Sequence, residues 1–342
     1  MTLRRIVLVL FVAGALACAA GYLAVTHWLA TPLAITGPAA TVEIERGESL
    51  STVARKLAER GLLRHPRWLS AYARLTGADA KVRAGEYSVA AGTTPESLLR
   101  QFQSGQVVQH SVTFVEGWTF RDLRRALERE PALAQTLRGK SDAEVMSALG
   151  EARMAPEGLF FPDTYLFGKG TTDLDILRQA RARMQRELAA AWEDRADDLP
   201  FATPYDALVL ASIVERETAN PAERPRIAGV FAARLRIGMR LQTDPTVIYG
   251  LGPKFDGNLR RADLERDGPY NTYTRAGLPP TPIAMPGADS IRAAVRPDAR
   301  GELYFVATGL PDGTHHFSKT LAEHDQAVRE YLVRYRQQRK GQ

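Results

Sequence analysis

The N-terminal apolar segment constrains this chain more than any other feature. An uncharged run from Ile6 to Val25 follows Arg4 and Arg5, and the next Asp, Glu, Lys or Arg is Glu43. At about 1.5 Å per residue, a helix of this length reaches about 30 Å, the thickness of a bilayer core. The run therefore predicts a helix that crosses a membrane once.

The charges around this run predict its orientation, because arginines gather on the cytoplasmic side of a membrane span. We predict a cytoplasmic tail at residues 1–5, a transmembrane helix at 6–26 and all following residues on the outer side of the cytoplasmic (inner) membrane. Trp28 is then expected at the membrane interface. A cleaved signal peptide is the alternative, but its apolar core is usually shorter. The only cysteine, Cys18, falls in the run, so neither an intrachain disulfide nor a cysteine nucleophile is expected.

Composition and charge describe the rest of the chain as globular and basic. Its 342 residues suffice for two domains. Subtracting 39 acidic from 45 basic side chains leaves a net charge of +6, which favours anionic partners such as lipid or cell-wall polymer. We expect no nucleic acid as a partner, since the sequence has no concentrated basic stripe with interleaved aromatic residues.

A local pattern recurs three times after a predicted linker at residues 27–41. Each copy has a short alternating strand, a glycine turn with a Ser or Thr, and an amphipathic helix. The turns are Gly47-Glu48-Ser49, Gly92-Thr93-Thr94 and Gly117-Trp118-Thr119. The pattern predicts small mixed α+β units.

The second half of the chain is predicted to be mainly helical around one irregular stretch. Helices are expected at 174–192, 206–218, 227–235 and 321–335, with a buried strand at 303–307 and a turn at Asp312-Gly313. Residues 241–286 lose helical periodicity and are rich in Pro, Gly, Asn, Thr and Tyr. So long a stretch without regular structure indicates a functional segment.

The helix predicted at 206–218 carries a candidate catalytic acid. At 100° per residue, Glu217 lies in the middle of the apolar stripe and Glu215 lies on the other side. Desolvation on an apolar face raises the pKa of a carboxyl, as a general acid near neutral pH requires. The alternative is a structural Glu217 that is paired with Arg216 or Arg224.

The irregular stretch offers the kinds of side chain that bind sugars. Planar hydrogen-bonding groups and aromatic faces suit the polar edges and apolar faces of a pyranose. These side chains are Gln242, Thr243, Asp244, Asn258, Asn271, Thr272, Tyr249, Tyr270 and Tyr273. We predict that this stretch lines a groove beside Glu217, with ordinary surface turns as the alternative.

Other catalytic classes find little support in the sequence. His315 and His316 are adjacent, so in a strand they point to opposite sides and are poorly placed to share a metal. The metal-binding patterns HExxH and CxxC, the nucleophile elbow GxSxG and the Walker A loop do not occur. We expect no metal site.

Several motifs together resemble the YceG-like, MltG-type endolytic murein transglycosylases. They are LFFPDTY at 159–165, ASIVERET at 211–218, RLRIGMRLQTDPTV at 234–247, YNTY at 270–273 and HHF at 315–317. The resemblance covers nearly the whole chain. It implies an α+β fold with an N-terminal transmembrane helix, a small LysM-like subdomain at 42–110 and a larger mixed α+β catalytic domain at 111–338.

The resemblance also implies the site and the reaction. Glu217 would be the single catalytic acid/base, and no metal or organic cofactor would be needed. The substrate-binding residues are expected to be Gln242, Thr243, Asp244, Tyr249, Asn271, Tyr273 and His315. The enzyme would cut the β-1,4 bond between N-acetylmuramic acid and N-acetylglucosamine within nascent strands, leave a 1,6-anhydro end and thereby set strand length.

The implied partners are peptidoglycan glycan strands, the cytoplasmic membrane and, as further candidates, peptidoglycan synthases. Two alternatives stay open. One is a lysozyme-like hydrolase that uses Asp244 as a second carboxylate, and the other is a non-catalytic scaffold that binds peptidoglycan.

Overall fold

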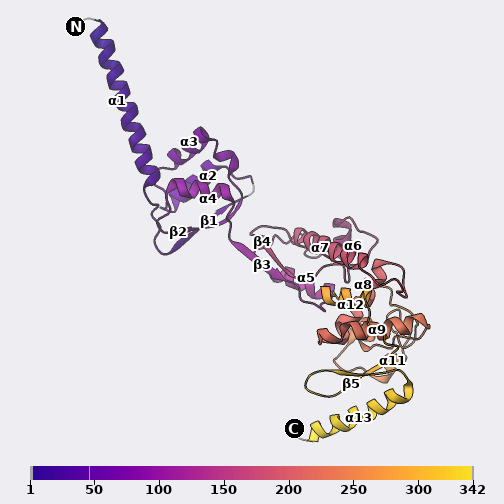
Figure 1. Cartoon of the computed structure of the whole chain (residues 1–342). Coiled ribbons are helices and arrows are strands. Elements are labelled where there is room, and N and C mark those ends of the chain that lie inside the picture. Colours follow the sequence, from indigo (N-terminus) through magenta and orange to yellow (C-terminus); the bar gives the residue numbers. More distant parts are fainter. Residues whose placement is uncertain (1–2, 46, 341–342) are drawn as a thin grey trace. The chain divides into compact units, whose positions relative to one another are not determined.

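The computed structural model describes residues 3–45 and 47–340, so residues 1 and 2 of the predicted tail lie outside the described residues. Helices and small two-stranded sheets alternate along the chain (Figure 1). The chain divides into two compact units. Unit 1 comprises residues 1–110 and 166–170, and unit 2 comprises 111–165 and 171–342. The chain is therefore of the mixed helix and strand class that the sequence predicts.

The first helix, α1, spans Leu3–Ala30 and is long and apolar enough to cross a membrane. Its side chains are exposed along most of its length, as in a helix that apolar surroundings would cover. The last turn of α1 was expected to begin a linker, with Trp28 at the membrane interface, but its structure is different. Trp28 and Leu29 are buried in the core of unit 1, and the Trp28 ring meets Trp68 edge to face at 5.6 Å. The apolar end of the helix thus finds its cover within the protein.

Unit 1 continues with two strands and three further α-helices. They are β1 (Ala39–Ile44), α2 (Leu50–Glu59), α3 (Pro66–Thr76), the 3-10 turn η1 (Asp79–Lys81), β2 (Gly85–Ala90) and α4 (Pro95–Ser104). The strands β1 and β2 are antiparallel, with Val42 opposite Tyr87. Tyr87 and Phe102 are fully buried and pack edge to face, so β2 and α4 share one core.

The recurring strand, turn and helix pattern is confirmed. Ser49, Thr94 and Thr119 each cap the helix that follows, because each hydroxyl accepts a backbone N–H from three residues further on. The third copy consists of β3 (Gln109–Thr113) and α5 (Phe120–Arg129). The strand β3 pairs with β4 (Thr164–Gly168), and the boundary between the units runs through both strands.

Unit 2 is mainly helical. Its further elements are α6 (Asp142–Ala148), α7 (Asp173–Glu193), α8 (Pro204–Glu217), η2 (Pro221–Glu223), α9 (Arg224–Arg236), α10 (Asp244–Leu251), η3 (Gly252–Lys254), α11 (Arg261–Glu265), α12 (Ala288–Val295), β5 (Tyr304–Ala307), β6 (His315–Ser318) and α13 (Leu321–Lys340). The central helix, α8, packs against α7, α9, α10 and α12. Every residue from Ala207 to Val214 is buried, so α8 is covered on all sides.

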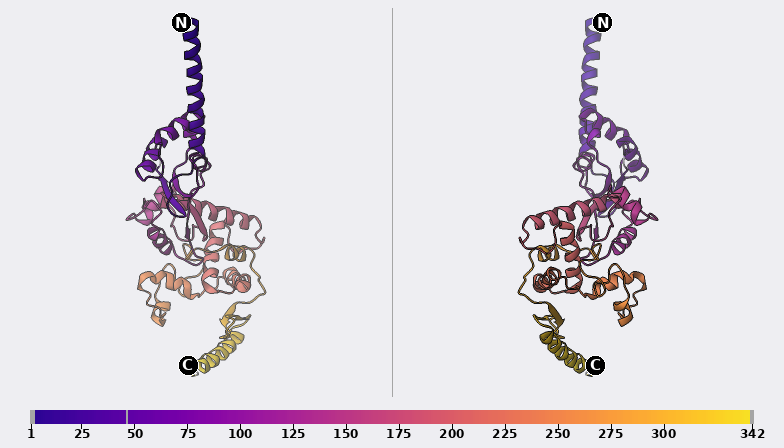
Figure 2. Two further views of the ribbon diagram at one scale, coloured as in Figure 1. Left: turned by 90° about the vertical axis from the view of Figure 1, so that its left-hand side faces the viewer. Right: turned by 90° about the vertical axis from the view of Figure 1, so that its right-hand side faces the viewer.

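Two predictions for this region need correction. Residues 241–286 are not without helices, since α10, η3 and α11 lie within them. These helices are too short to leave a periodic pattern, and Pro245 sits at the start of α10, where a proline fits. The strand predicted at 303–307 is half-buried rather than buried, because it belongs to the small β5–β6 hairpin that packs against α13 (Figure 2).

Candidate active site

The candidate acid Glu217 is the last residue of α8 and is half-buried. The Thr243 hydroxyl donates a hydrogen bond of 2.7 Å to Glu217 Oε2. No basic side chain in the described part of the chain forms an ion pair with this carboxyl. Burial raises the pKa of Glu217, and the nearby charge of Asp244 raises it further, whereas the Thr243 hydrogen bond lowers it. The net pKa shift favours the protonated form of this carboxyl, as a proton donor requires.

The neighbouring acid, Glu215, has a different environment. It forms an ion pair of 3.0 Å with Arg224 and accepts the backbone N–H of Gly287 at 3.0 Å. Arg216 donates to the carbonyl of Gly117 at 3.2 Å. Neither arginine pairs with Glu217, so the ion pair with Arg216 or Arg224 that was the alternative for that residue does not form. The helical wheel distinguished the two acids by helix face, but α8 is buried on all sides. The two acids differ because Glu215 has an ionic partner and Glu217 has none among the described residues.

A strained backbone turn brings Thr243 to the acid. Gln242 has a φ of 50°, the only positive φ of a non-glycine residue within the described ranges. Its N–H donates to the Thr272 carbonyl at 3.1 Å, and the Thr243 N–H donates to the Thr272 hydroxyl at 3.1 Å. The Thr246 hydroxyl lies 2.8 Å from the same hydroxyl. This threonine network fixes the turn that carries the hydrogen-bond donor to Glu217.

Asp244 and Tyr273 form a pair next to Glu217. The Tyr273 hydroxyl donates to Asp244 Oδ1 at 2.5 Å. Buried Arg234 donates to the carbonyls of Leu241 at 2.6 Å and Leu303 at 2.7 Å, and thereby ties α9 to the segment that precedes the turn. The charge of Arg234 also lowers the pKa of Glu217 slightly against the effect of burial. Arg234 is a site residue to which the sequence pattern assigned no role.

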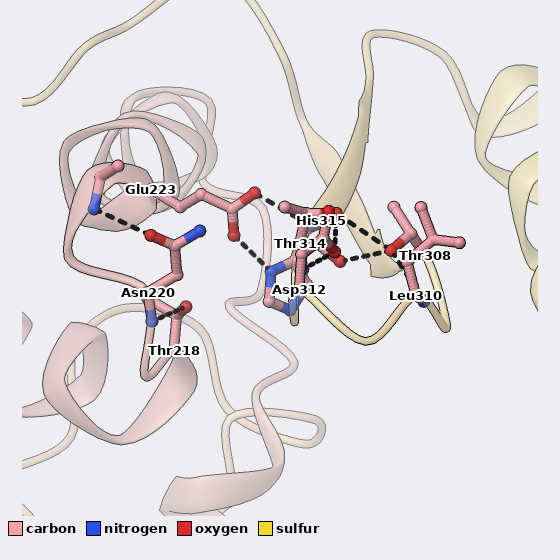
Figure 3. Close-up of polar contacts among 9 residues, drawn as sticks. Thr218, Asn220, Glu223, Thr308, Leu310, Asp312, Thr314 and His315 are labelled. Carbon is pink, nitrogen blue, oxygen red and sulfur yellow. Dashed lines mark hydrogen bonds and ion pairs between the residues drawn. The ribbon is translucent and has the colours of Figure 1, made fainter.

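His315 reaches the same region from β6. One Glu223 carboxylate oxygen accepts a hydrogen bond from the backbone N–H of His315 at 2.9 Å. The other oxygen lies 2.7 Å from His315 Nδ1 (Figure 3). The carboxylate therefore fixes the ring and leaves Nε2 as its other polar atom. His315 is close enough to lower the pKa of Glu217. Glu223 was missed, since a lone acid in a turn carries no signal before the fold is known.

Two predicted groove residues have other partners. Asn271 is buried, and its amide nitrogen donates to three backbone carbonyls, of Asp263, Leu264 and Arg266, at 2.7–3.2 Å. The Tyr249 hydroxyl donates to Glu157 at 3.0 Å, within a cleft whose lining does not include Glu217. Thr243, Asp244 and Tyr273 thus gather at Glu217, whereas one groove that includes Tyr249 and Asn271 stays a prediction.

Comparisons with known proteins bear on this site. The model of the YceG-like family matches residues 42–330. The chain belongs to the YceG-like family. The matched region contains Glu217 and every residue that the structure gathers around it. In the part of the chain that the structure describes, no three or more His, Cys, Asp or Glu side chains are grouped so that they could hold a metal.

Named relatives and a solved structure extend the match. The endolytic murein transglycosylase of Bacillus subtilis is 30% identical over 308 residues, which are 85% of this chain and 84% of that protein. The endolytic murein transglycosylase of Streptococcus pneumoniae is 28% identical over 85% of this chain and 58% of its own longer length. A crystal structure of a yceG-like protein from Listeria monocytogenes has a TM-score of 0.52 and 29% identity, covering 85% of this chain and 99% of that one.

Proposed function

We propose that this protein is an endolytic lytic transglycosylase of peptidoglycan. The observation that carries the proposal is the Glu217 carboxyl, which is desolvated, has no ionic partner among the described residues and is held by Thr243. The names of the relatives from Bacillus subtilis and Streptococcus pneumoniae supply the reaction class. The substrate bond would be the β-1,4 link between N-acetylmuramic acid and N-acetylglucosamine.

The first chemical step needs a proton donor. Protonated Glu217 would give its proton to the glycosidic oxygen as the bond to C1 breaks, and the leaving sugar departs as an alcohol. Burial supports this role because it keeps the carboxyl protonated at a higher pH than in water. The N-acetyl group of the substrate would stabilise the positive charge that develops at C1.

The second step needs a base at the same position. Ionised Glu217 would take the proton of the C6 hydroxyl while that oxygen bonds to C1 and closes the 1,6-anhydro ring. The Thr243 hydroxyl supports this step, since it donates to the ionised carboxylate. The proton balance closes on one residue, and no water enters the product. A glycosidase that uses water normally requires a second carboxylate.

The sequence indicates one candidate for such a second carboxylate, which is Asp244. It accepts the short hydrogen bond from Tyr273, and its charge raises the pKa of Glu217. We assign it the role of holding Glu217 protonated, with Gln242, Tyr273 and His315 as further contacts for the sugar. A lysozyme-like hydrolase would instead use Asp244 to activate water.

The length and apolar surface of α1 support a single-pass anchor in the cytoplasmic membrane, with the rest of unit 1 and all of unit 2 outside. Residues 42–110 would then be a LysM-like module that binds glycan close to the membrane. A cut within nascent strands at this position would set their length beside the peptidoglycan synthases.

The test incubates the full-length protein in detergent with purified glycan strands and identifies the new ends by mass. We expect ends that are lighter by one water than ordinary reducing ends, and none with a Glu217→Gln variant. Ordinary reducing ends would favour the hydrolase, and uncut strands would favour the scaffold.

A further inference from the structure

The cleft that contains Tyr249 and Glu157 lies in unit 2 next to the candidate active site. It has a volume of about 630 Å³ and is walled by α5, α10 and the end of α8. Arg216 and Pro245 line it, and they adjoin Glu217 and Asp244 in the sequence. A ligand in this cleft therefore lies against the same two helices that carry the candidate acid and its neighbour.

The most buried polar group of the cleft is the side chain of Glu157, which is 6% exposed as a residue. One carboxyl oxygen accepts the Phe120 N–H at 2.9 Å, and the other accepts the Tyr249 hydroxyl at 3.0 Å. No described basic side chain pairs with it. Burial raises the pKa of Glu157 to about 7, so this carboxyl is only partly ionised near neutral pH and acts as a hydrogen-bonding group.

The charged side chains that line the cleft are not all paired. Two acids on its lining are already paired, Asp122 with Arg125 at 2.6 Å and Asp142 with Arg124 at 2.9 Å. Two arginines of the lining, Arg121 and Arg216, have no carboxylate partner in the described part of the chain. The Arg216 group on α8 donates to the Gly117 carbonyl at 3.2 Å, so the charges of both arginines are not neutralised by an ion pair with a described residue.

Aromatic and amide-binding groups accompany this charge. Trp118 and Tyr270 line the cleft, and the Tyr270 ring meets Tyr249 edge to face at 4.8 Å. Such a lining suits a ligand that has apolar groups, hydrogen-bonding amides and at least one carboxylate. An unmodified neutral sugar would leave the two arginines unused.

We propose that this cleft binds the carboxylate-bearing peptide side chain of the glycan substrate, with Arg121 as an anchor for the carboxylate. The inference rests on the proposed function, since the peptide is joined to the muramic acid residues of that strand. A strand held at Glu217 carries such a branch close to its scissile bond, and the adjoining cleft matches the branch in charge. The site would make the enzyme prefer strands that still carry peptides.

The test measures binding without cleavage. Full-length protein with Glu217→Gln is titrated with two strand preparations of equal length, one with intact peptides and one from which an amidase has removed them. We expect the peptide-bearing strands to bind about tenfold more tightly, the effect of one charge-assisted hydrogen bond. Adding Arg121→Gln should abolish this preference and leave the binding of stripped strands unchanged.

Arg129 provides the matched control. It lies on the same helix, is exposed and does not line the cleft, so Arg129→Gln should keep the preference. Equal weakening of both preparations by Arg121→Gln would indicate a subsite for neutral sugar and overturn the proposal, as would no effect. Cleavage is measured separately with Glu217 intact. A protein that does not cleave but still prefers peptide-bearing strands would refute the proposed reaction and leave the proposed peptide binding in the cleft standing.

Discussion

Glu217 and Glu215 stand two residues apart on one helix, and replacing each by glutamine should have opposite consequences. Glu217→Gln removes the proton donor and should lower the cleavage rate by about 10²–10⁴. The amide oxygen can still accept the Thr243 hydrogen bond, and no buried charge remains. The melting temperature of this variant should therefore stay the same or rise.

Glu215→Gln breaks a buried ion pair instead. Removing one partner of such a pair costs about 3–5 kcal/mol. We expect the lower end, because Arg224 keeps Glu116 at 3.6 Å and Asp289 at 3.8 Å. At roughly 2–4 °C per kcal/mol for a domain of this size, the melting temperature should fall by about 6–12 °C.

The assay combines calorimetry with the release of soluble fragments from glycan strands at a temperature where both variants are folded. Folded Glu215→Gln should retain cleavage within about tenfold of the wild type, since its carboxyl contacts Arg224 and Gly287 rather than the candidate groove. An inactive Glu215→Gln together with an active Glu217→Gln would refute the assignment of the acid.

Three further outcomes follow from the structure and the sequence. Glu157 has a pKa of about 7 in the folded protein against 4.5 in a model peptide, so the folded state binds more protons in this window and loses stability as the pH rises from 4.5 to 7. The Glu157→Gln variant should not show this loss of about 3 kcal/mol in the free energy of unfolding. Denaturant titrations in which wild type and variant lose the same stability over this pH range would contradict the prediction. Glu223→Gln should lower kcat roughly 10–100-fold by releasing His315, with no loss of folded protein, and an unchanged kcat would remove the histidine from the mechanism. Protease added to intact spheroplasts should digest unit 2 and the part of unit 1 that follows α1, whereas full protection would reverse the predicted topology.

The sequence was sufficient for features that depend on local chemistry. Ser49, Thr94 and Thr119 cap helices because a hydroxyl before an amphipathic run satisfies free N–H groups wherever it occurs. Glu217 could be selected because a carboxyl among apolar helix positions is desolvated in any fold that buries the helix. These features need no knowledge of distant contacts.

Features that depend on contacts between distant segments could not be predicted. The pairing of Glu223 with His315 joins residues 92 positions apart, and that of Tyr249 with Glu157 joins residues 92 positions apart as well. The sequence suggested Trp28 as an interfacial anchor. Its burial could not be predicted, because it depends on Trp68 in another helix. The sequence suggested Asn271 as a sugar ligand. The three carbonyls that accept hydrogen bonds from its amide nitrogen come together only in the folded loop, so its actual role could not be predicted.

The most direct test of the central claim is a cleavage reaction in water labelled with heavy oxygen, followed by mass analysis of the new muramic acid ends. In the proposed reaction Glu217 takes the proton of the C6 hydroxyl as the C6 oxygen bonds to C1, so the new ends should lack one water and carry no label. New ends that are not dehydrated and contain one labelled oxygen would show that water attacks C1, and would contradict the lytic transglycosylase account.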